Sequence, residues 1–553
     1  MHVVIPMSGS GERFAKAGYN LPKPLIQVDG EPIIKYVVSM FSPEDRFTFI
    51  CNEKHLSKTN LESTLRAIAP RGEIVSIMPH KTGPVGAVNQ CLDCIKDNEE
   101  TIVNYCDFYS LWNYPDFLQN TRARQAAGAI VAYRDFHPHM LGTDNYAFIK
   151  EKNLWLEAIQ EKRPFTSNRM QEFASNGTYY FSKGAHIKKY FAELVQRNIN
   201  INGEFYVSMV YNLMVEDKLP VSIYKVSNML QWGTPKDLEE YQKWSDYFRE
   251  LTKEPERSRA PARVDVCLIP MAGRGKRFTD SGYDLPKPLI SVSGKPMVVQ
   301  AVDSLPPANR YIFVALEDHL KRSELATILQ SQFKPSSIVS LPDVTEGQAI
   351  TCELGLAQAS PAVTPDSSLL IGTCDNALVY NQSYYEQLLD DKNWDVCAFT
   401  FRNHPSSASK PEMYGWLEVN DKSERFPKIT GVSVKKPIST MPQNDHAIVG
   451  TFCFRKISTF TKAVDLLKAK DRRVNGEFYA DSLIETAMEL GYRCVVFEVD
   501  QYICFGTPDD LKTFEYWQSF FHRCPWHPYN VELDKKVGPH KSDLVSKILR
   551  NSK

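Results

Sequence analysis

The chain has 553 residues and an ordinary composition for a folded globular protein, with 43% hydrophobic and 24% charged residues. Its 65 Lys and Arg residues nearly balance 66 Asp and Glu residues, and a net charge of -1 excludes the basic excess that is typical of nucleic-acid-binding proteins. Because the sequence has neither a run of 18 apolar residues nor a signal-peptide pattern at its start, we expect a cytoplasmic protein that binds neither membrane nor nucleic acid.

The first predicted element is a short apolar strand at residues 3–7, VVIPM, which leads into an irregular motif rich in Gly, Arg, Lys and Pro. Residues 5–32 read IPMSGSGERFAKAGYNLPKPLIQVDGEP. The sequence IPMAGRGKRFTDSGYDLPKPLISVSGKP follows 264 residues later, at 269–296, and 18 of the 28 positions are identical. Similarity over such an irregular motif indicates that a functional loop was duplicated together with its strand.

The rest of each half alternates short apolar strands with helix-like stretches. In the first half we expect strands at 47–52, 101–106 and 127–133 and helices at 58–69 and 87–97. The second half repeats the strand pattern at 267–271, 310–316, 368–374 and 395–401. This alternation predicts an α/β fold, with a mostly parallel, mixed sheet that has helices on both faces. Ligands of such sheets bind at the carboxyl ends of the strands.

Further repeated motifs suggest the domain organisation. YCDF around Asp107 returns as TCDN around Asp375. Three further motifs each return 273 residues later: KRP at 162–164, which returns as KKP, NGEFY at 202–206, and a GTP turn at 233–235. We therefore expect one domain over residues 1–249 and a second over 264–522. The polar, proline-containing segment 250–263 predicts a linker. The tail, 523–553, has no counterpart in the first copy and is a candidate packing arm or docking element.

The duplicated motif contains residue types that can hold a triphosphate. Glycines let backbone amides approach a phosphate closely because they lack a Cβ, and the cations beside them can balance its charge. The glycines are Gly9, Gly11, Gly273 and Gly275, and the cations are Arg13, Lys23, Arg277 and Lys287. This composition suits phosphoryl or nucleotidyl transfer. The dinucleotide-binding fingerprint is excluded because its third glycine is missing, and the Walker pattern because no GK[ST] follows.

The composite pattern PMxGxGxRF, followed by GYxLPKPLIxVxGxP, resembles the signature of the nucleoside-diphosphate-sugar pyrophosphorylases, a family of nucleotidyltransferases, over nearly the whole of both halves. The resemblance implies two tandem Rossmann-like α/β domains and a reaction that requires Mg²⁺. That reaction joins a nucleoside triphosphate to a phosphorylated small molecule and releases pyrophosphate. Since the acceptor's phosphate oxygen attacks the α-phosphorus, the protein has to align the reactants and stabilise the leaving group.

The resemblance also implies roles for residues near the nucleotide. Arg13 and Arg277 would hold the triphosphate and the departing pyrophosphate, and Lys23 and Lys287 would contact the α-phosphate. Asp107 and Asp375 match the metal aspartate of the family, and a helix N-cap is the structural alternative for them. Gln348, in the segment TEGQA, resembles a residue that hydrogen-bonds to the base.

On the acceptor side, the resemblance points to Lys162, Arg163, Glu204, Lys435, Lys436 and Glu477. Spacing leaves open whether Lys435 or Lys436 grips the acceptor phosphate, and a structural or solvated glutamate is the alternative for Glu204 and Glu477.

Two departures from the family concern the metal. Many members have a second metal aspartate two residues before the glycine of the GTP turn, where this chain has Gln231 and Cys504. Mg²⁺ favours charged oxygen ligands, so either one aspartate suffices together with the triphosphate, or Glu204 or Glu477 takes the missing place. The overall pattern looks more like branches encoded with bacterial capsule or surface-polymer genes, some of which use CTP.

The two copies also differ from each other, because TGPVGA in the first stands where TEGQA stands in the second, and Arg163 where Lys436 stands. We expect a tandem nucleotidyltransferase that uses an NTP, with CTP among the candidates, to make an activated precursor for surface polysaccharide. In one alternative only one copy is catalytic, with the second favoured and the other regulatory or structural. In another the protein senses nucleotides without turnover.

A glycosyltransferase is disfavoured because neither Asp107 nor Asp375 belongs to an Asp-x-Asp motif. Homo-oligomerisation is left open.

Overall fold

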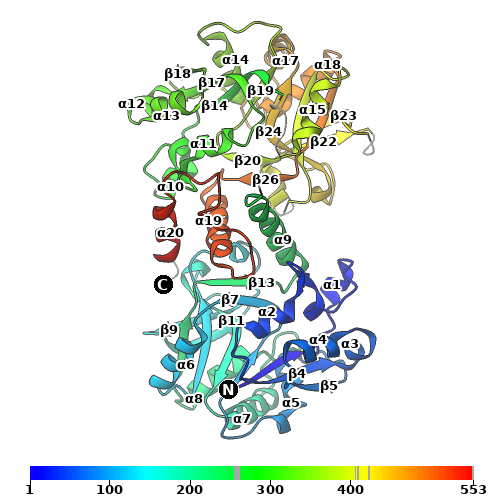
Figure 1. Cartoon of the computed structure of the whole chain (residues 1–553), viewed down its shortest axis with the longest axis vertical. Helices are drawn as coiled ribbons and strands as arrows, with labels where there is room; N and C mark the ends of the chain where they lie inside the picture. The colour runs from blue at the N-terminus through cyan, green and yellow to red at the C-terminus, as the bar shows by residue number, and fades with distance from the viewer. Residues whose placement is uncertain (254–261, 405, 408–409, 421–423, 551–553) are drawn as a thin grey trace. The chain divides into compact units, whose positions relative to one another are not determined.

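A computed structural model describes residues 1–253, 262–404, 406–407, 410–420 and 424–550 (Figure 1). They form two compact units. Unit 1 comprises Met1–Glu250, Tyr516–Asn530 and residues 545–550, and unit 2 comprises Leu251–Glu515 and Val531–Leu544. Residues 254–261, most of the predicted linker, lie outside the described residues. Part of the predicted tail therefore belongs to unit 1 and part to unit 2.

Unit 1 contains a mixed sheet with the strand order β5-β4-β1-β6-β11-β8-β12-β10-β9. The strands are β1 (His2–Met7), β4 (Arg46–Asn52), β5 (Glu73–Ile77), β6 (Thr101–Asn104), β8 (Gly128–Tyr133), β9 (Ala147–Lys152), β10 (Trp155–Glu161), β11 (Phe173–Phe181) and β12 (Val221–Lys225). β1 runs parallel to β4 and β6, whereas β11 is antiparallel to β6 and β8. Two short ribbons are separate from this sheet: β2 (Gln27–Val28) with β3 (Glu31–Pro32), and β7 (Phe108–Leu111) with β13 (Asn228–Gln231).

Unit 2 repeats this topology in the order β18-β17-β14-β19-β24-β21-β25, with β22 and β23 attached beside β24. Its strands are β14 (Val264–Met271), β17 (Ala308–Leu316), β18 (Ser336–Leu341), β19 (Leu369–Ile371), β21 (Val396–Phe401), β22 (Gly415–Val419), β23 (Ile429–Val434), β24 (His446–Phe454) and β25 (Cys494–Glu498). Its ribbons are β15 (Ser291–Val292) with β16 (Lys295–Pro296), and β20 (Asn376–Val379) with β26 (Gln501–Cys504).

Helices cover both faces of each sheet. Those of unit 1 are α1 (Glu12–Lys16), α2 (Ile33–Ser39), α3 (Glu53–Lys58), α4 (Leu61–Ile68), α5 (Gly83–Asn89), α6 (Tyr114–Ala123), α7 (Gly184–Gln196), α8 (Val207–Glu216) and α9 (Pro235–Glu250). Those of the second half are α10 (Lys276–Asp280), α11 (Met297–Val302), α12 (Glu317–Lys321), α13 (Leu325–Gln332), α14 (Gln348–Ala357), α15 (Gln382–Asp390), α17 (Ile457–Ala469), α18 (Leu483–Glu489), α19 (Pro508–Arg523) and α20 (Lys541–Arg550).

Strand β14 shows why the central strands read as continuous apolar runs. Val266 and Leu268 belong to a core cluster with α14, α17 and α18, whereas Cys267 and Ile269 belong to a second cluster with α11, α13 and α15. Successive side chains of a strand point to opposite faces, so a sheet covered on both sides needs an apolar residue at every position. The predicted α/β fold, with a mostly parallel, mixed sheet and helices on both faces, is confirmed.

One predicted helix is wrong in its extent. The stretch 87–97 was expected to be a single helix, but α5 ends at Asn89 and a short 3-10 turn occupies Leu92–Cys94. Cys91, Leu92 and Ile95 still pack on the core of unit 1. The apolar periodicity therefore continues across a break in the helix, and periodicity alone does not reveal where the hydrogen bonding stops.

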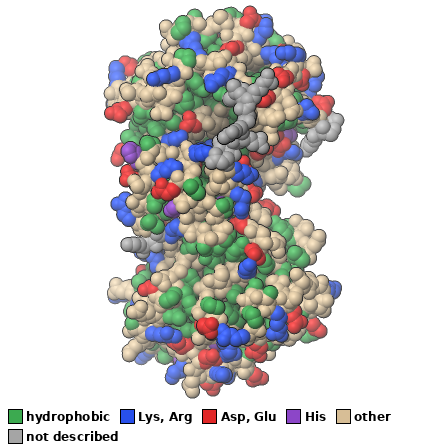
Figure 2. Space-filling model, in the orientation of Figure 1, with side chains coloured by type: hydrophobic (Ala, Val, Ile, Leu, Met, Phe, Trp, Pro, Cys, Tyr) green, Lys and Arg blue, Asp and Glu red, His purple; other side chains and the backbone are tan. Residues whose placement is uncertain are grey.

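The charge balance of the sequence is reflected at the surface. Figure 2 shows Lys and Arg side chains interspersed with Asp and Glu over the face in view. Within the described ranges, none of the helices combines the length and apolar character needed to cross a membrane.

Candidate active site

A glycine-rich turn follows the carboxyl end of the first strand in each unit. Gly11 and Gly275 have φ values of 68° and 66°, a left-handed conformation that favours glycine, and each directly precedes a short helix. A Cβ built on Gly9 or Gly273 would meet no atom within 4 Å. The turns therefore leave open space beside their backbone, as binding of a bulky anion requires.

A lysine–aspartate ion pair lies near this turn in both units. Lys23 Nζ is 2.9 Å from Asp107 Oδ2, and Lys287 Nζ is 2.5 Å from Asp375 Oδ2. Burial lowers the pKa of Lys23, whereas the charge and hydrogen bond of Asp107 and the nearby Cys106 raise it; the net shift is upward, so the ammonium stays charged. Each lysine also lies 5.7 Å from the ring of the phenylalanine after the arginine, Phe14 or Phe278.

Both aspartates lie in bends between two strands and not at the start of a helix. Asp107 precedes β7 and Asp375 precedes β20, so a helix N-cap role is excluded for both. The backbone carbonyls of the two aspartates accept hydrogen bonds from Trp232 N (2.9 Å) and Phe505 N (2.8 Å), which open the GTP turns. The backbone of each aspartate is thus held by a hydrogen bond from the residue that follows the partner strand of its ribbon.

Arg13 and Arg277 are exposed, and among the described residues neither guanidinium group has a hydrogen-bond or ion-pair partner. Arg13 nevertheless acts electrostatically on Lys23 and Tyr206, and Arg277 acts on Lys435. Both cations therefore lie near the lysines of the candidate site and are available to a ligand.

The glycine of each GTP turn lies between the aspartate of the Lys–Asp pair and the residue that occupies the position of the missing second aspartate. A Cβ on Gly233 would be 3.1 Å from Asp107 Oδ2 and 2.6 Å from Gln231 Nε2, and one on Gly506 would be 3.2 Å from Asp375 Oδ2 and 3.3 Å from Cys504 Sγ. Cys504 donates to Asp510 Oδ2 at 3.4 Å, and burial raises its thiol pKa.

No group of three or more His, Cys, Asp or Glu side chains in the described ranges could hold a metal on its own. One carboxylate per site still fits Mg²⁺, which typically binds one or two carboxylates together with substrate phosphates and waters.

The loop expected to read the base packs on the NGEFY motif in both units. In unit 1, Phe205 N donates to Thr82 O at 3.0 Å, and in unit 2 Phe478 N donates to Glu346 O at 2.8 Å. Thr82 therefore corresponds to Glu346, and Pro84 corresponds to Gln348. The sequence alone did not give this register because TGPVGA and TEGQA differ in length. Gln348 is half-buried, whereas Pro84 offers neither a polar side chain nor a backbone N–H.

The two loops are held by different chemistry. In unit 1 the His80 ring contacts Ser8 Oγ through Nε2 at 3.0 Å and Thr82 Oγ1 through Nδ1 at 2.8 Å. Burial lowers the pKa of His80, which favours the neutral ring. In unit 2 Arg274 Nη2 pairs with Asp343 Oδ1 at 2.7 Å instead, and both side chains are largely exposed.

The lysines expected to bind the acceptor phosphate occupy matching positions. The backbone N–H of Lys162 donates to Tyr146 O at 2.8 Å, and that of Lys435 donates to Tyr414 O at 3.0 Å. Both residues have positive φ, 57° and 63°. Their ammonium groups lie over tyrosine rings, Lys162 at 4.6 Å from Tyr206 and Lys435 at 5.3 Å from Tyr479. Lys435 is thus the counterpart of Lys162.

Their neighbours, Arg163 and Lys436, are exposed. In unit 1 the Lys162 ammonium also donates to Tyr206 Oη at 2.6 Å, and that hydroxyl donates to Glu204. Glu477 occupies the equivalent place in unit 2, where Lys435 instead donates to the Met413 carbonyl.

A half-buried carboxylate lies beside each of these lysines, and the sequence motifs did not point to it. In unit 1 it is Glu161, which accepts a hydrogen bond from Ser208 Oγ at 2.6 Å. In unit 2 Val434 replaces that glutamate and Asp481 replaces the serine. Burial raises the pKa of Asp481 to about 6, partly offset by Lys435. The repeat offset of 273 could have shown this exchange, had the two motifs been compared position by position.

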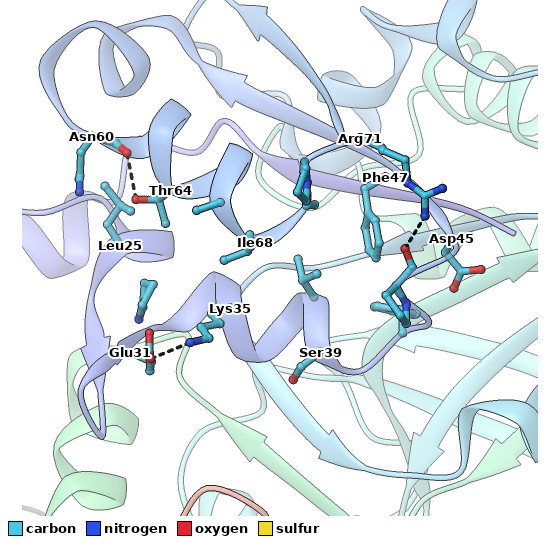
Figure 3. A pocket seen from close by; sticks show the side chains of 18 of the residues that line it. Leu25, Glu31, Lys35, Ser39, Asp45, Phe47, Asn60, Thr64, Ile68 and Arg71 are labelled. Carbon is cyan, nitrogen blue, oxygen red and sulfur yellow. Dashed lines mark hydrogen bonds and ion pairs between the residues drawn. The ribbon is translucent and has the colours of Figure 1, made fainter.

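One cavity of unit 1 lies apart from these residues. It encloses about 840 Å³ between α2 and α4, and Leu25, Lys35, Phe47, Ile68 and Arg71 are among its lining residues (Figure 3). The glycine-rich turn, Lys23 and Asp107 do not line it. This cavity is therefore not the candidate site, which rests on the convergence of the repeated motifs.

Residues 2–243 match the family model described as Nucleotidyl transferase. Among solved structures, a nucleoside-diphosphate-sugar pyrophosphorylase from Vibrio cholerae RC9 is 19% identical, with coverage of 43% of this chain and 99% of that one and a TM-score of 0.38. The inositol-1-phosphate CTP transferase from T. maritima is 15% identical, with coverage of 47% and 96% and a TM-score of 0.36. A putative glucose-1-phosphate thymidylyltransferase from Bacillus anthracis is 16% identical, with coverage of 44% and 94% and a TM-score of 0.36. No curated protein sequence matches the chain.

Proposed function

We propose, from the match of residues 2–243 to the nucleotidyl transferase family model, that the chain is a tandem sugar-phosphate-type nucleotidyltransferase with one site in each unit. The observation that carries the proposal is the repeated Lys–Asp ion pair, Lys23–Asp107 and Lys287–Asp375, beside a glycine-rich turn with an exposed arginine. Unit 2 shares the strand order of unit 1 and the same motif residues, which supports a second site of the same kind.

In the proposed reaction a phosphate oxygen of the acceptor attacks the α-phosphorus of an NTP. A new P–O bond forms, the bond to the β-phosphate breaks, and pyrophosphate leaves with its electron pair. Lys23 or Lys287 stabilises the charge on the α-phosphate, and Arg13 or Arg277 stabilises the pyrophosphate. Mg²⁺, when bound by Asp107 or Asp375 together with the triphosphate, neutralises further phosphate charge.

The acceptor side uses Lys162 in unit 1 and Lys435 in unit 2. Both ammonium groups lie over a tyrosine ring, close to the glutamate of NGEFY, so a phosphate and its attached hydroxyls would meet a cation and a carboxylate together. Arg163 and Lys436, which are exposed next to these lysines, would add positive charge at the rim.

The base, the acceptor and the cellular role are finer parts of the proposal. Gln348, half-buried at the first position of α14, would read the base in unit 2, with CTP among the candidates. The sequence resemblance to branches encoded with capsule genes supports a cytoplasmic enzyme that makes a surface-polysaccharide precursor. Self-association of the chain is compatible with this role.

A second candidate function is that only unit 2 is catalytic. The observation that favours it is Pro84, which stands in unit 1 where unit 2 has Gln348 and offers the base no hydrogen bond from its side chain. Unit 1 would then bind a nucleotide for regulation or serve a structural role.

Pyrophosphate release tests the proposal directly. The full chain is incubated with each NTP, Mg²⁺ and a panel of sugar phosphates and phosphorylated alcohols. We expect release with at least one pair, and a loss of at least about 100-fold when Lys23 and Lys287 are both replaced by Ala. Lys16→Ala, which removes an exposed lysine of α1, is the matched control and should keep full activity. If no NTP and acceptor pair gave pyrophosphate release, the proposal that the chain is a nucleotidyltransferase would be refuted.

A further inference from the structure

The last part of α19 and the segment after it, Tyr516–Asn530, belong to unit 1 although they lie at the end of the second repeat and beyond it in sequence. Tyr516 Oη donates to Met229 O at 2.7 Å, and Arg523 Nη1 donates to Ser227 Oγ at 3.3 Å. Met229 is in β13, the strand that pairs with β7 directly after Asp107. The end of the chain therefore binds the ribbon that supports the candidate metal aspartate.

Trp526 packs on an aromatic side chain of that ribbon. Its ring is 4.7 Å from Tyr109 and 4.3 Å from Tyr36, and both tyrosines lie against Trp232. Tyr109 is two residues after Asp107, and Trp232 N holds the Asp107 carbonyl at 2.9 Å. One layer of aromatic side chains thus separates Trp526 from the backbone of Asp107. We name this layer, Tyr36, Tyr109, Trp232 and Tyr241, the aromatic seat.

Asp29 anchors Trp526 to the seat. Its side chain is 8% exposed and accepts hydrogen bonds from Tyr241 Oη (2.6 Å), Ser245 Oγ (2.5 Å) and Arg249 Nη2 (2.8 Å). The Trp526 indole N–H adds a fourth donor at 3.2 Å. A buried carboxylate is costly unless it is hydrogen-bonded, so this set of donors specifies where the indole binds.

The seat is specific to unit 1. The internal repeat places Gln300, Ala377, Phe505 and Phe514 at the positions of Tyr36, Tyr109, Trp232 and Tyr241, and Ser293 at that of Asp29. Strand pairing supports this alignment at Tyr109 and Trp232. Gln231 pairs with Phe108 in unit 1 as Cys504 pairs with Asn376 in unit 2, so the residues that follow them also correspond. The two repeats keep the same Lys–Asp pair and diverge where the segment Tyr516–Asn530 packs.

We propose that the aromatic seat is a docking surface for the segment Tyr516–Asn530, and that Trp526 is a positioning residue for Asp107, so that the site of unit 1 depends on this segment while the site of unit 2 does not. This inference rests on the proposed function for its activity readout only. Loss of the indole leaves Tyr109 and Tyr36 without their packing partner and Asp29 without one donor, and the β7–β13 ribbon loosens. Misplacing a reacting group by about 1 Å can cost about 100-fold in rate.

The test uses full-length chains in which one site is silenced. In a Lys287→Ala background, where only unit 1 turns over, Trp526→Ala should lower kcat at least about 10-fold, with a smaller change in KM for the NTP. Trp526→Phe should restore most of the rate. In a Lys23→Ala background, the same substitution should change turnover of unit 2 by less than about 2-fold. Leu533→Ala, which alters an exposed side chain further along the tail, is the matched control.

Hydrogen exchange separates this inference from the proposed function. Amides of β7 and β13 should exchange faster in Trp526→Ala and in the milder variant Asp29→Asn, whereas amides of β20 and β26 should be unchanged. If the wild-type protein shows no turnover but these exchange rates change as stated, the proposed function fails and the docking stands. Unchanged exchange in β7 and β13, or equal loss of rate in both backgrounds, would overturn the inference.

Discussion

At the scale of single residues, the sequence predicted the shared chemistry better than the differences. Lys23 and Asp107, and their repeats, were recognised because they recur in irregular motifs, and the structure brings each pair into contact. The exchange of Glu161 for Asp481 was missed because the two carboxylates come from different elements. A pattern that is read along the chain cannot show that two residues 47 positions apart, Glu161 and Ser208, share one hydrogen bond.

Asp481 makes the stability of unit 2 depend on pH. Its pKa is raised from 3.8 to about 6 in the folded protein, so the folded state binds the proton more tightly than the unfolded state. Ionisation of Asp481 therefore destabilises the folded protein. This destabilisation grows as the pH rises from about 4 to 6 and reaches its full size above pH 6. Asp481→Asn removes it. We expect the variant to be more stable by about 1 kcal/mol at pH 7.5, after discounting for partial exposure, and no more stable near pH 4.

Thermal unfolding of the full chain between pH 4 and 8 measures this difference. Asp390→Asn, at an exposed position of α15, is the control and should leave the unfolding midpoint unchanged at every pH. A stability gain from Asp481→Asn that is equal at pH 4 and pH 7.5 would show that burial does not raise the pKa of Asp481.

At the scale of elements, strands were predictable and their connections were not. The apolar residues at 3–7, 267–271 and 396–401 all lie in strands, because a sheet covered on both faces demands apolar residues throughout. The β7–β13 and β20–β26 ribbons escaped prediction because they are four residues long and pair across more than 110 residues. Local propensity contains no signal for such a pairing, although these ribbons hold the candidate metal aspartates.

The connection between NGEFY and the loop that we expect to read the base depends on a glycine in each unit, Gly83 or Gly347. Gly347 has φ of 141°, and a Cβ there would lie 2.5 Å from the backbone nitrogen and oxygen of Phe478. Gly347→Ala should therefore break the hydrogen bonds between Ala349 and Phe478 and between Phe478 and Glu346, at a cost of about 1–3 kcal/mol. Hydrogen exchange at the Ala349 and Phe478 amides measures this, and both should exchange faster.

Gly142→Ala provides the comparison for that substitution. Gly142 has a negative φ, and its Cβ would meet only the His139 carbonyl at 3.4 Å, which is ordinary contact. This variant should leave the Ala349 and Phe478 amides unchanged. If Gly347→Ala also leaves them protected, the loop can shift to accept a side chain, and the close approach is not what fixes Gln348.

At the scale of the whole molecule, each unit contains its own glycine-rich turn, its own Lys–Asp pair and its own lysine that we expect to bind the acceptor, so we expect each to work without residues from the other repeat's motifs. The Tyr516–Asn530 segment lies outside the repeated motifs and is the exception that the sequence could not reveal, because its part after His522 has no counterpart in the first copy. If both units are enzymes, the NTP and acceptor profile of the wild type should equal the sum of the profiles of Lys23→Ala and Lys287→Ala. Since Pro84 and Gln348 differ in what they offer a base, we expect the two profiles to favour different NTPs. Pyrophosphate release over the full NTP and acceptor panel measures all three proteins. Loss of every activity in either single variant would show that the two sites act in series or that only one turns over, and a wild-type profile matched by Lys23→Ala alone would assign catalysis to unit 2.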